Sequence, residues 1–158
     1  MEFIKNQLQE LLTNYGPITS IFFDAWDWKI SYDEVPYEQV NKFIKSIQPN
    51  CLVVNNSQEW IPQTTDIIAY EMGIHEWKNV KKLPDNNNLP AEACETLARN
   101  NNWFWNSAES DICVTADHIY KLRKYLFERN ANLLLNVAPD TTGRIPEAQI
   151  IRLLETKL

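Results

Sequence analysis

The stretch LLTNYGPITSIFFDAWDW (residues 11–28) joins the end of a helical pattern to an apolar run that ends on a carboxylate. Apolar side chains recur at helical spacing from residue 3 to Tyr15, and Gly16-Pro17 ends that pattern. The run ITSIFFD at 18–24 is rich in Ile and Phe, which is typical of a buried strand. The stretch therefore predicts an amphipathic helix followed by a strand that ends at Asp24.

The same alternation of helical patterns and apolar runs continues along the chain. Further helices are predicted at 37–47, at 116–129 and from Pro146 onward. The predicted strands are 18–23, 51–55, 66–70, 102–105 and 132–136. Parallel strands joined by crossover helices produce this order of elements. We therefore expect an α/β fold with about five parallel strands and crossover helices.

Composition argues against two classes of function. The 158 residues include 15 Lys+Arg and 21 Asp+Glu, a net charge of −6, so no basic footprint for a phosphate backbone is present. No apolar run approaches the roughly 18 to 20 residues of a membrane-spanning helix. The first ten residues, MEFIKNQLQE, lack the apolar core of a signal peptide. We expect one domain's length of chain with no nucleic-acid or membrane partner, and the compartment stays open.

The cysteines predict neither a disulfide framework nor a metal centre. Cys51, Cys94 and Cys113 are unevenly spaced and form no Cys-x-x-Cys pair. Cys51 begins an apolar run and is expected to be a small buried residue. No cofactor or metal is expected.

The segment 72–91 shows no convincing period. It contains HEWKNVKKLPDNNNLP and therefore His75, one of the two histidines of the chain. A loop of this length in a compact domain is usually functional or disordered.

Each apolar run ends in a polar side chain, and ligands of parallel α/β folds bind at the carboxyl ends of strands. Two of these side chains, Asp24 and Glu71, could form a carboxylate pair. Glycoside hydrolysis needs such a pair, one carboxylate to attack the anomeric carbon and one acid to protonate the leaving oxygen. The tryptophans near these positions would supply stacking faces; they are Trp26, Trp28, Trp103 and Trp105. The alternatives are helix-capping or solvated carboxylates and ordinary core aromatics.

IFFDAWDW at 21–28, preceded by LLTNYGPI at 11–18, resembles the nucleophile segment of glycoside hydrolase family 29, the α-L-fucosidases. Further similar segments follow in the family's order: IQPNCLVVNN at 47–56, DIIAYE at 66–71, LPAEACETL with NWFWN at 89–106, and NLLLNVAPDTTGRIPEAQIIRLLE at 132–155. The last resembles the family's final strand, its Pro-Asp-x-x-Gly loop and the following helix. The resemblance covers nearly the whole chain.

This resemblance implies roles for individual residues. Asp24 would be the nucleophile and Glu71 the general acid/base, with Glu92 as the alternative acid/base. The side chains of Trp26, Trp103, Trp105, Glu92 and His75 would contact the substrate, a fucosylated glycan. Asn136 and Asp140 are better explained by loop and turn geometry around Gly143. Two residues depart from the family pattern, because Ala25 replaces a Gly and Ser57 replaces an Arg.

Length limits the fold that the resemblance implies. A (β/α)8 barrel needs about 250 residues, so residues 1–158 are expected to form the C-terminal part of a TIM-like barrel, a partial catalytic domain. The expected function is retaining α-L-fucosidase activity when the barrel is complete. The alternative is a non-catalytic relative that binds sugar or a partner through an open sheet edge. The expected partners of the chain are the N-terminal half of the barrel or a second copy. Family members are often secreted, periplasmic or lysosomal.

Overall fold

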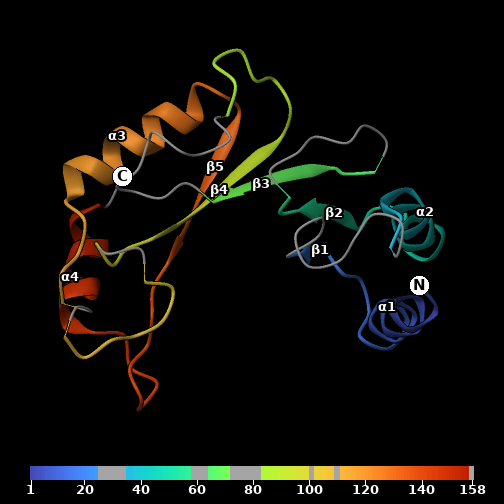
Figure 1. Ribbon diagram of the computed structural model, residues 1–158, viewed down its shortest axis with the longest axis horizontal. Coiled ribbons are helices and arrows are strands. Elements are labelled where there is room, and N and C mark those ends of the chain that lie inside the picture. The colour runs from blue at the N-terminus through green and yellow to red at the C-terminus, as the bar shows by residue number, and fades with distance from the viewer. Residues whose placement is uncertain (25–34, 58–63, 72–82, 100–101, 109–110, 157–158) are drawn as a thin grey trace. The chain divides into compact units, whose positions relative to one another are not determined.

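The computed structural model describes residues 1–24, 35–57, 64–71, 83–99, 102–108 and 111–156 (Figure 1). The chain divides into two compact units, Met1–Ala69 and Tyr70–Leu158, so the division falls within one strand. The described elements, in chain order, are α1 (Glu2–Asn14), β1 (Ser20–Phe23), α2 (Tyr37–Ile47), β2 (Leu52–Asn55), β3 (Ile67–Glu71), β4 (Ala91–Thr96), α3 (Ala116–Phe127), β5 (Ala131–Asn136) and α4 (Glu147–Glu155). This confirms the predicted α/β class with five parallel strands and helices between them.

The first unit packs two helices against one face of parallel strands. β1 pairs with β2 in parallel, with Phe22 opposite Val54, and β2 pairs with β3 in parallel. α2 begins after Pro36, and its buried residues recur at helical spacing, so one face of the helix is apolar. The core of this unit consists of Leu8, Leu12, Val35, Tyr37, Val40, Ile44, Cys51 and Val53.

The side chain of Gln48, directly after α2, joins the end of α1 to the start of β1. Its Oε1 accepts a hydrogen bond from the Ile18 N–H at 2.7 Å. Its Nε2 donates to the carbonyl oxygens of Leu12 at 2.7 Å and Gly16 at 2.9 Å. Gly16 has a φ of +76°, a conformation that favours glycine, so the Gly16-Pro17 break predicted from sequence is the turn into β1.

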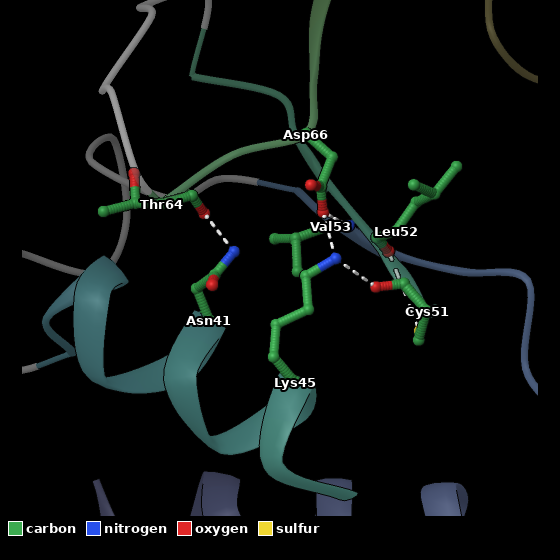
Figure 2. A network of polar contacts seen from close by, with 7 residues as sticks. All are labelled: Asn41, Lys45, Cys51, Leu52, Val53, Thr64 and Asp66. Atoms are coloured by element: carbon green, nitrogen blue, oxygen red, sulfur yellow. Dashed lines mark hydrogen bonds and ion pairs between the residues drawn. The ribbon is translucent and has the colours of Figure 1, made fainter. Parts of the chain in front are cut away.

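Figure 2 shows a polar network that connects α2 to the amino ends of β2 and β3. The carboxylate of Asp66 accepts hydrogen bonds from the Val53 N–H and from Lys45 Nζ, both at 2.7 Å. Lys45 Nζ also donates to the Cys51 carbonyl at 2.7 Å. Burial raises the pKa of the Cys51 thiol, and the charge of Lys45 partly opposes the shift. Cys51 is buried, as expected from the sequence.

The second unit packs α3 against β5 (Figure 1). β4 and β5 are parallel and in register from Ala91–Ala131 to Thr96–Asn136. The buried face of α3 consists of Ile119, Leu122 and Leu126, which recur at helical spacing within the predicted helix. Leu133 and Leu135 of β5 pack against the cluster that contains Ile119, so this face of the strand is the helix-facing one.

Arg129, after α3, connects that helix to the segment that precedes β4. Its Nη2 lies 2.8 Å from the Asp85 carboxylate, and its Nη1 donates to the Tyr125 carbonyl at 3.0 Å. The guanidinium also stacks on the Tyr125 ring, with Cζ 3.7 Å from the ring centroid. The Arg129 carbonyl accepts from Asn87 Nδ2 at 2.7 Å, so the described end of the long irregular stretch is tied to α3.

The prediction of a strand at 102–105 is wrong. The fourth strand is β4, Ala91–Thr96, and residues 102–105 lie outside the sheet, with a bend at Trp103 and Phe104. The sequence AEACET has small side chains at Ala91 and Ala93 and carboxylates at Glu92 and Glu95, so it lacks the apolar run that marks the other strands. The aromatic run that suggested a strand is partly solvated, since Trp103 is 38% and Phe104 85% exposed.

Candidate active site

Asp24 and Asn56 follow the carboxyl ends of two paired strands, β1 and β2. The Asn56 N–H donates to the Phe23 carbonyl at 2.9 Å, so the parallel pairing continues to the last residue of β1. The Asn56 side chain then lies beside that of Asp24, and Nδ2 donates to Asp24 Oδ1 at 2.9 Å. Asp24 is solvent-exposed. The first unit therefore presents an exposed carboxylate that accepts a hydrogen bond from the amide of the neighbouring strand.

Asn55, the last residue of β2, shapes the turn that follows. Its side chain is fully buried, and Oδ1 accepts from the Ser57 N–H at 3.0 Å. This bond bends the chain directly after Asn56. Ser57 is the position at which the resemblance leads one to expect an Arg.

Glu71 is the last residue of β3 and is half-buried. It belongs to the second unit, whereas Asp24 belongs to the first. The preceding strand residues Ala69 and Tyr70 are buried, and burial raises the pKa of the Tyr70 hydroxyl. Glu71 thus occupies the carboxyl end of its strand, as predicted. A carboxyl separation of about 5 to 5.5 Å between Asp24 and Glu71 stays a prediction.

Glu92, the alternative acid/base, lies at the other end of its strand. It is the second residue of β4 and lies opposite Asn132 in β5, whose Nδ2 donates to Glu92 Oε2 at 3.0 Å. Thr96, at the carboxyl end of β4, lies four positions further along the strand, about 13 Å away at the rise of a strand. Ligands of parallel sheets bind at carboxyl ends, so the position of Glu71 fits an acid/base role better than that of Glu92.

Trp103 and Trp105 lie on a segment that leaves the sheet just after β4. Antiparallel backbone contacts join the two ends of this segment. The Val114 N–H donates to the Leu97 carbonyl at 3.0 Å, and the Arg99 N–H donates to the Ile112 carbonyl at 2.8 Å. The Trp103 carbonyl accepts from Asn136 Nδ2 at 3.0 Å, at the carboxyl end of β5. These contacts hold the Trp103 backbone at the carboxyl edge of β4 and β5.

Two residues that matter in this geometry received no site role from the sequence. Asn56 contacts the Asp24 carboxylate, and Asn136 holds Trp103. Their positions at the ends of apolar runs were visible, but only the fold shows which side chain each amide faces. A third polar residue, Glu95, is buried on the face that it shares with Ala93, opposite Leu135, and therefore points toward the helix layer.

Asp140 forms the turn that the sequence predicts around Gly143. Its Oδ1 accepts from the Thr142 hydroxyl at 2.6 Å, the Thr142 N–H at 2.7 Å and the Arg144 N–H at 3.1 Å. These bonds, the Thr142 hydroxyl first, lower the pKa of Asp140. Gly143 has a φ of +82°, which explains a glycine there. Asp140 therefore has a structural partner for its carboxylate.

Two predicted sugar-contacting residues, Trp26 and His75, lie outside the described residues, as does Trp28. Within the described ranges, no group of three or more His, Cys, Asp or Glu side chains could hold a metal ion. In that same part of the chain, no helix has the length and apolar character needed to cross a membrane.

The sequence matches the family model "Alpha-L-fucosidase" over residues 1–156. Among solved structures, α-L-fucosidase isoenzyme 1 from Paenibacillus thiaminolyticus is similar, with a TM-score of 0.69 and 28% identity over 98% of this chain and 37% of that one. The α-L-fucosidase AlfC from Lactobacillus casei, in complex with its α-L-fucose product, has a TM-score of 0.67 and 24% identity over 97% of this chain and 42% of that one. None of the curated protein sequences gives a significant match. The chain thus spans less than half the length of the solved relatives named here.

Proposed function

The chain belongs to the α-L-fucosidase family, and from this premise we propose that residues 1–158 form part of the catalytic domain of a retaining α-L-fucosidase. Its substrates are glycans with terminal α-L-fucosyl linkages. The observation that carries the proposal is the contact between Asp24 and Asn56 at the carboxyl ends of β1 and β2. An exposed carboxylate that accepts a hydrogen bond from a side-chain amide at that edge supports a role for Asp24 in acting on a bound sugar.

Asp24 supplies the nucleophile in the proposed mechanism. One carboxylate oxygen attacks the anomeric carbon while the bond to the leaving oxygen breaks, which gives a β-linked fucosyl ester on Asp24. The hydrogen bond from Asn56 Nδ2 to Oδ1 restrains that carboxylate oxygen, which lowers the cost of orienting the carboxylate for attack.

Glu71 supplies the general acid and then the general base. In the first step its carboxyl proton passes to the leaving oxygen, and in the second its carboxylate removes a proton from the water that attacks the ester. Two inversions at the anomeric carbon give net retention. The position of Glu71 at the end of β3, half-buried after the buried residues Ala69 and Tyr70, supports this role. Glu92, at the amino end of β4, is the alternative.

The sugar-binding surface is assigned to tryptophans and a histidine. Trp103 and Trp105 follow the carboxyl end of β4 and offer apolar faces to the ring. The resemblance to the family assigns substrate contact also to Trp26, two residues after the nucleophile, and to His75. No cofactor enters the mechanism.

Activity requires further strands in this proposal. In the first unit, Phe22 and Leu52 are 44% and 36% exposed, whereas Val53, which follows Leu52 and belongs to the core packed by the helices, is fully buried. In the second unit, Leu134 is 44% exposed, and it alternates with the helix-facing Leu133 and Leu135. Inner faces of TIM-barrel strands are filled by side chains from the other strands. We propose that the remaining strands of a (β/α)8 barrel cover these side chains.

The test uses a barrel completed by fusing the chain to the strands of the Paenibacillus thiaminolyticus enzyme that it does not cover. The fusion should hydrolyse an aryl α-L-fucoside, and Asp24→Ala should reduce turnover by about three orders of magnitude or more. Glu71→Ala should slow substrates with poor leaving groups far more than aryl fucosides, because only the poor leaving groups need protonation.

Added azide separates the two roles by stereochemistry. With Asp24→Ala, azide replaces the nucleophile directly and yields the β-fucosyl azide by one inversion. With Glu71→Ala, azide intercepts the β-linked ester and yields the α-fucosyl azide by two inversions. Loss of activity in Glu92→Ala with full activity in Glu71→Ala would move the acid/base role to Glu92. A folded fusion that binds fucose without turnover would instead indicate the non-catalytic binding module.

A further inference from the structure

Asn136 contacts two segments that meet at the carboxyl edge of β4 and β5. It is the last residue of β5 and lies opposite Thr96, the last residue of β4. Its carbonyl oxygen accepts from the Leu97 N–H at 3.0 Å, and its Nδ2 donates to the Trp103 carbonyl at 3.0 Å. A single residue therefore binds the end of β4 through its backbone and the aromatic segment 102–106 through its side chain.

The hydrogen bond from Asn136 is not the only contact that holds the segment between β4 and α3. The two ends of this segment are joined by the antiparallel bridge between Ala98 and Cys113 and by the hydrogen bond from the Arg99 N–H to the Ile112 carbonyl. The Thr96 hydroxyl donates to the Ala98 carbonyl at 2.8 Å and stiffens the exit from β4. Trp103 itself is 38% exposed, so part of its indole is accessible to a ligand.

We propose that Asn136 is a positioning residue for sugar recognition. Its amide holds the Trp103 backbone so that the indole presents its face to a sugar ring at the carboxyl edge of β4 and β5. This proposal rests on the proposed function, since it assumes a fucosyl ligand at that edge. A fixed aromatic platform binds more tightly than a mobile one because less conformational freedom is lost on binding.

Asn132 provides a matched control on the same strand. It lies on the same face of β5 as Asn136, and its amide donates a hydrogen bond of equal length, 3.0 Å, to Glu92 at the amino end. Removal of either amide deletes one solvent-accessible hydrogen bond, but only Asn136 contacts the aromatic segment. A general loss of strand stability would affect both variants alike.

The effect of the Asn136 hydrogen bond on Trp103 is tested first without sugar. The full chain is labelled with 5-fluorotryptophan and observed by 19F NMR. The Trp103→Phe variant assigns the Trp103 resonance. Asn136→Ala should shift and broaden that resonance, and Asn136→Asp should do the same because a carboxylate of equal size has no N–H to donate. Asn132→Ala should leave it unchanged. A Trp103 resonance unaffected by both Asn136 variants would overturn the proposal.

Sugar recognition is tested in the completed barrel by steady-state kinetics. Asn136→Ala should raise KM for an aryl α-L-fucoside by about fivefold to tenfold, the effect of one hydrogen bond, with kcat within about twofold. In a Trp103→Ala background, Asn136→Ala should have no further effect on KM, because the group that it positions is gone. Additive effects of the two substitutions, or an unchanged KM, would overturn the proposal.

Turnover of the Asp24→Ala variant tests the proposed function independently of the Asn136 variants. If Asp24→Ala retains full turnover, the assignment of Asp24 fails whatever the Asn136 variants do. If Asp24→Ala abolishes turnover while Asn136→Ala leaves KM unchanged, the proposed function stands and the positioning role of Asn136 is wrong.

Discussion

The side-chain amide of Asn56 donates a 2.9 Å hydrogen bond to the carboxylate of Asp24. The contact follows directly from parallel pairing, because the backbone bond from Asn56 to Phe23 places the residues after β1 and β2 side by side. The neighbouring strand therefore supplies a hydrogen-bond partner to the carboxylate of the proposed nucleophile.

Replacement of Asn56 should lower catalysis without removing the nucleophile. In the completed barrel, Asn56→Ala should reduce kcat by about 10- to 100-fold, because a misoriented carboxylate reaches the anomeric carbon less often. Asn41→Ala is the control, since its amide donates to the Thr64 carbonyl at 3.1 Å elsewhere in the same unit and should leave kcat unchanged. Equal kcat values for the two variants would refute the orienting role.

The carboxyl-end residues could be predicted from sequence because apolar runs mark buried strands directly. Asp24 and Glu71 each end such a run, and the structure places each at the end of its strand. β4 could not be predicted in this way. Its neighbour β5 supplies Leu133 and Leu135 to the helix-facing side, so small Ala91 and Ala93 suffice there and no apolar run is needed.

The polar partners could not be predicted because they depend on register. Asn132 and Asn136 have the same residue type on the same face of β5, yet one contacts Glu92 and the other contacts Trp103. Only the pairing of β4 with β5 shows that Asn132 lies opposite Glu92 near the amino ends of the two strands, whereas Asn136 lies opposite Thr96 at their carboxyl ends. Sequence spacing predicted turn geometry for Asp140, because Gly143 marks the turn by its conformational freedom.

The network of Figure 2 should contribute strongly to stability. Asp66→Ala removes the acceptor of the N–H of fully buried Val53 and the ion-pair partner of Lys45, so we expect a loss of about 1 to 3 kcal/mol in the free energy of unfolding. Asp66→Asn keeps an acceptor oxygen and should cost less.

Urea denaturation followed by circular dichroism measures this loss. The control is Lys42→Ala, which breaks the solvent-exposed pair with Glu38 on the same helix and should cost at most about 0.5 kcal/mol. An Asp66→Ala chain as stable as the Lys42→Ala chain would show that the network contributes little.

Arg129 should not tolerate replacement by lysine. Arg129→Lys keeps the charge but loses the two-sided contact with Asp85 and the Tyr125 carbonyl and the stacking on the Tyr125 ring, so we expect a loss of about 1 to 2 kcal/mol in the free energy of unfolding. Limited proteolysis should then cut faster within residues 83–90.

Asp85→Asn separates the ion pair from the stacking. The Asp85 side chain is 92% exposed, against 15% for Arg129, so water screens the pair from the carboxylate side, and this variant should lose at most about 0.5 kcal/mol and keep its protease resistance. If Asp85→Asn is as damaging as Arg129→Lys, the ion pair and not the stacking holds the segment.

The turn at Asp140 should loosen in acid. Hydrogen bonds to the ionised carboxylate lower the pKa of Asp140 below its ordinary value of 3.8, so the folded turn binds this proton more weakly than the unfolded chain does. The contribution of these hydrogen bonds to stability is therefore complete above the ordinary value and is lost as the pH falls through the lowered pKa.

The amide resonances of Thr142 and Arg144, recorded by 15N NMR from pH 6 to pH 2, should titrate together with a midpoint below 3.8. Asp140→Asn keeps an acceptor oxygen but cannot titrate, so both amides should then stay constant across that range. A midpoint at or above 3.8 in the unsubstituted chain would mean that these bonds do not favour the ionised form.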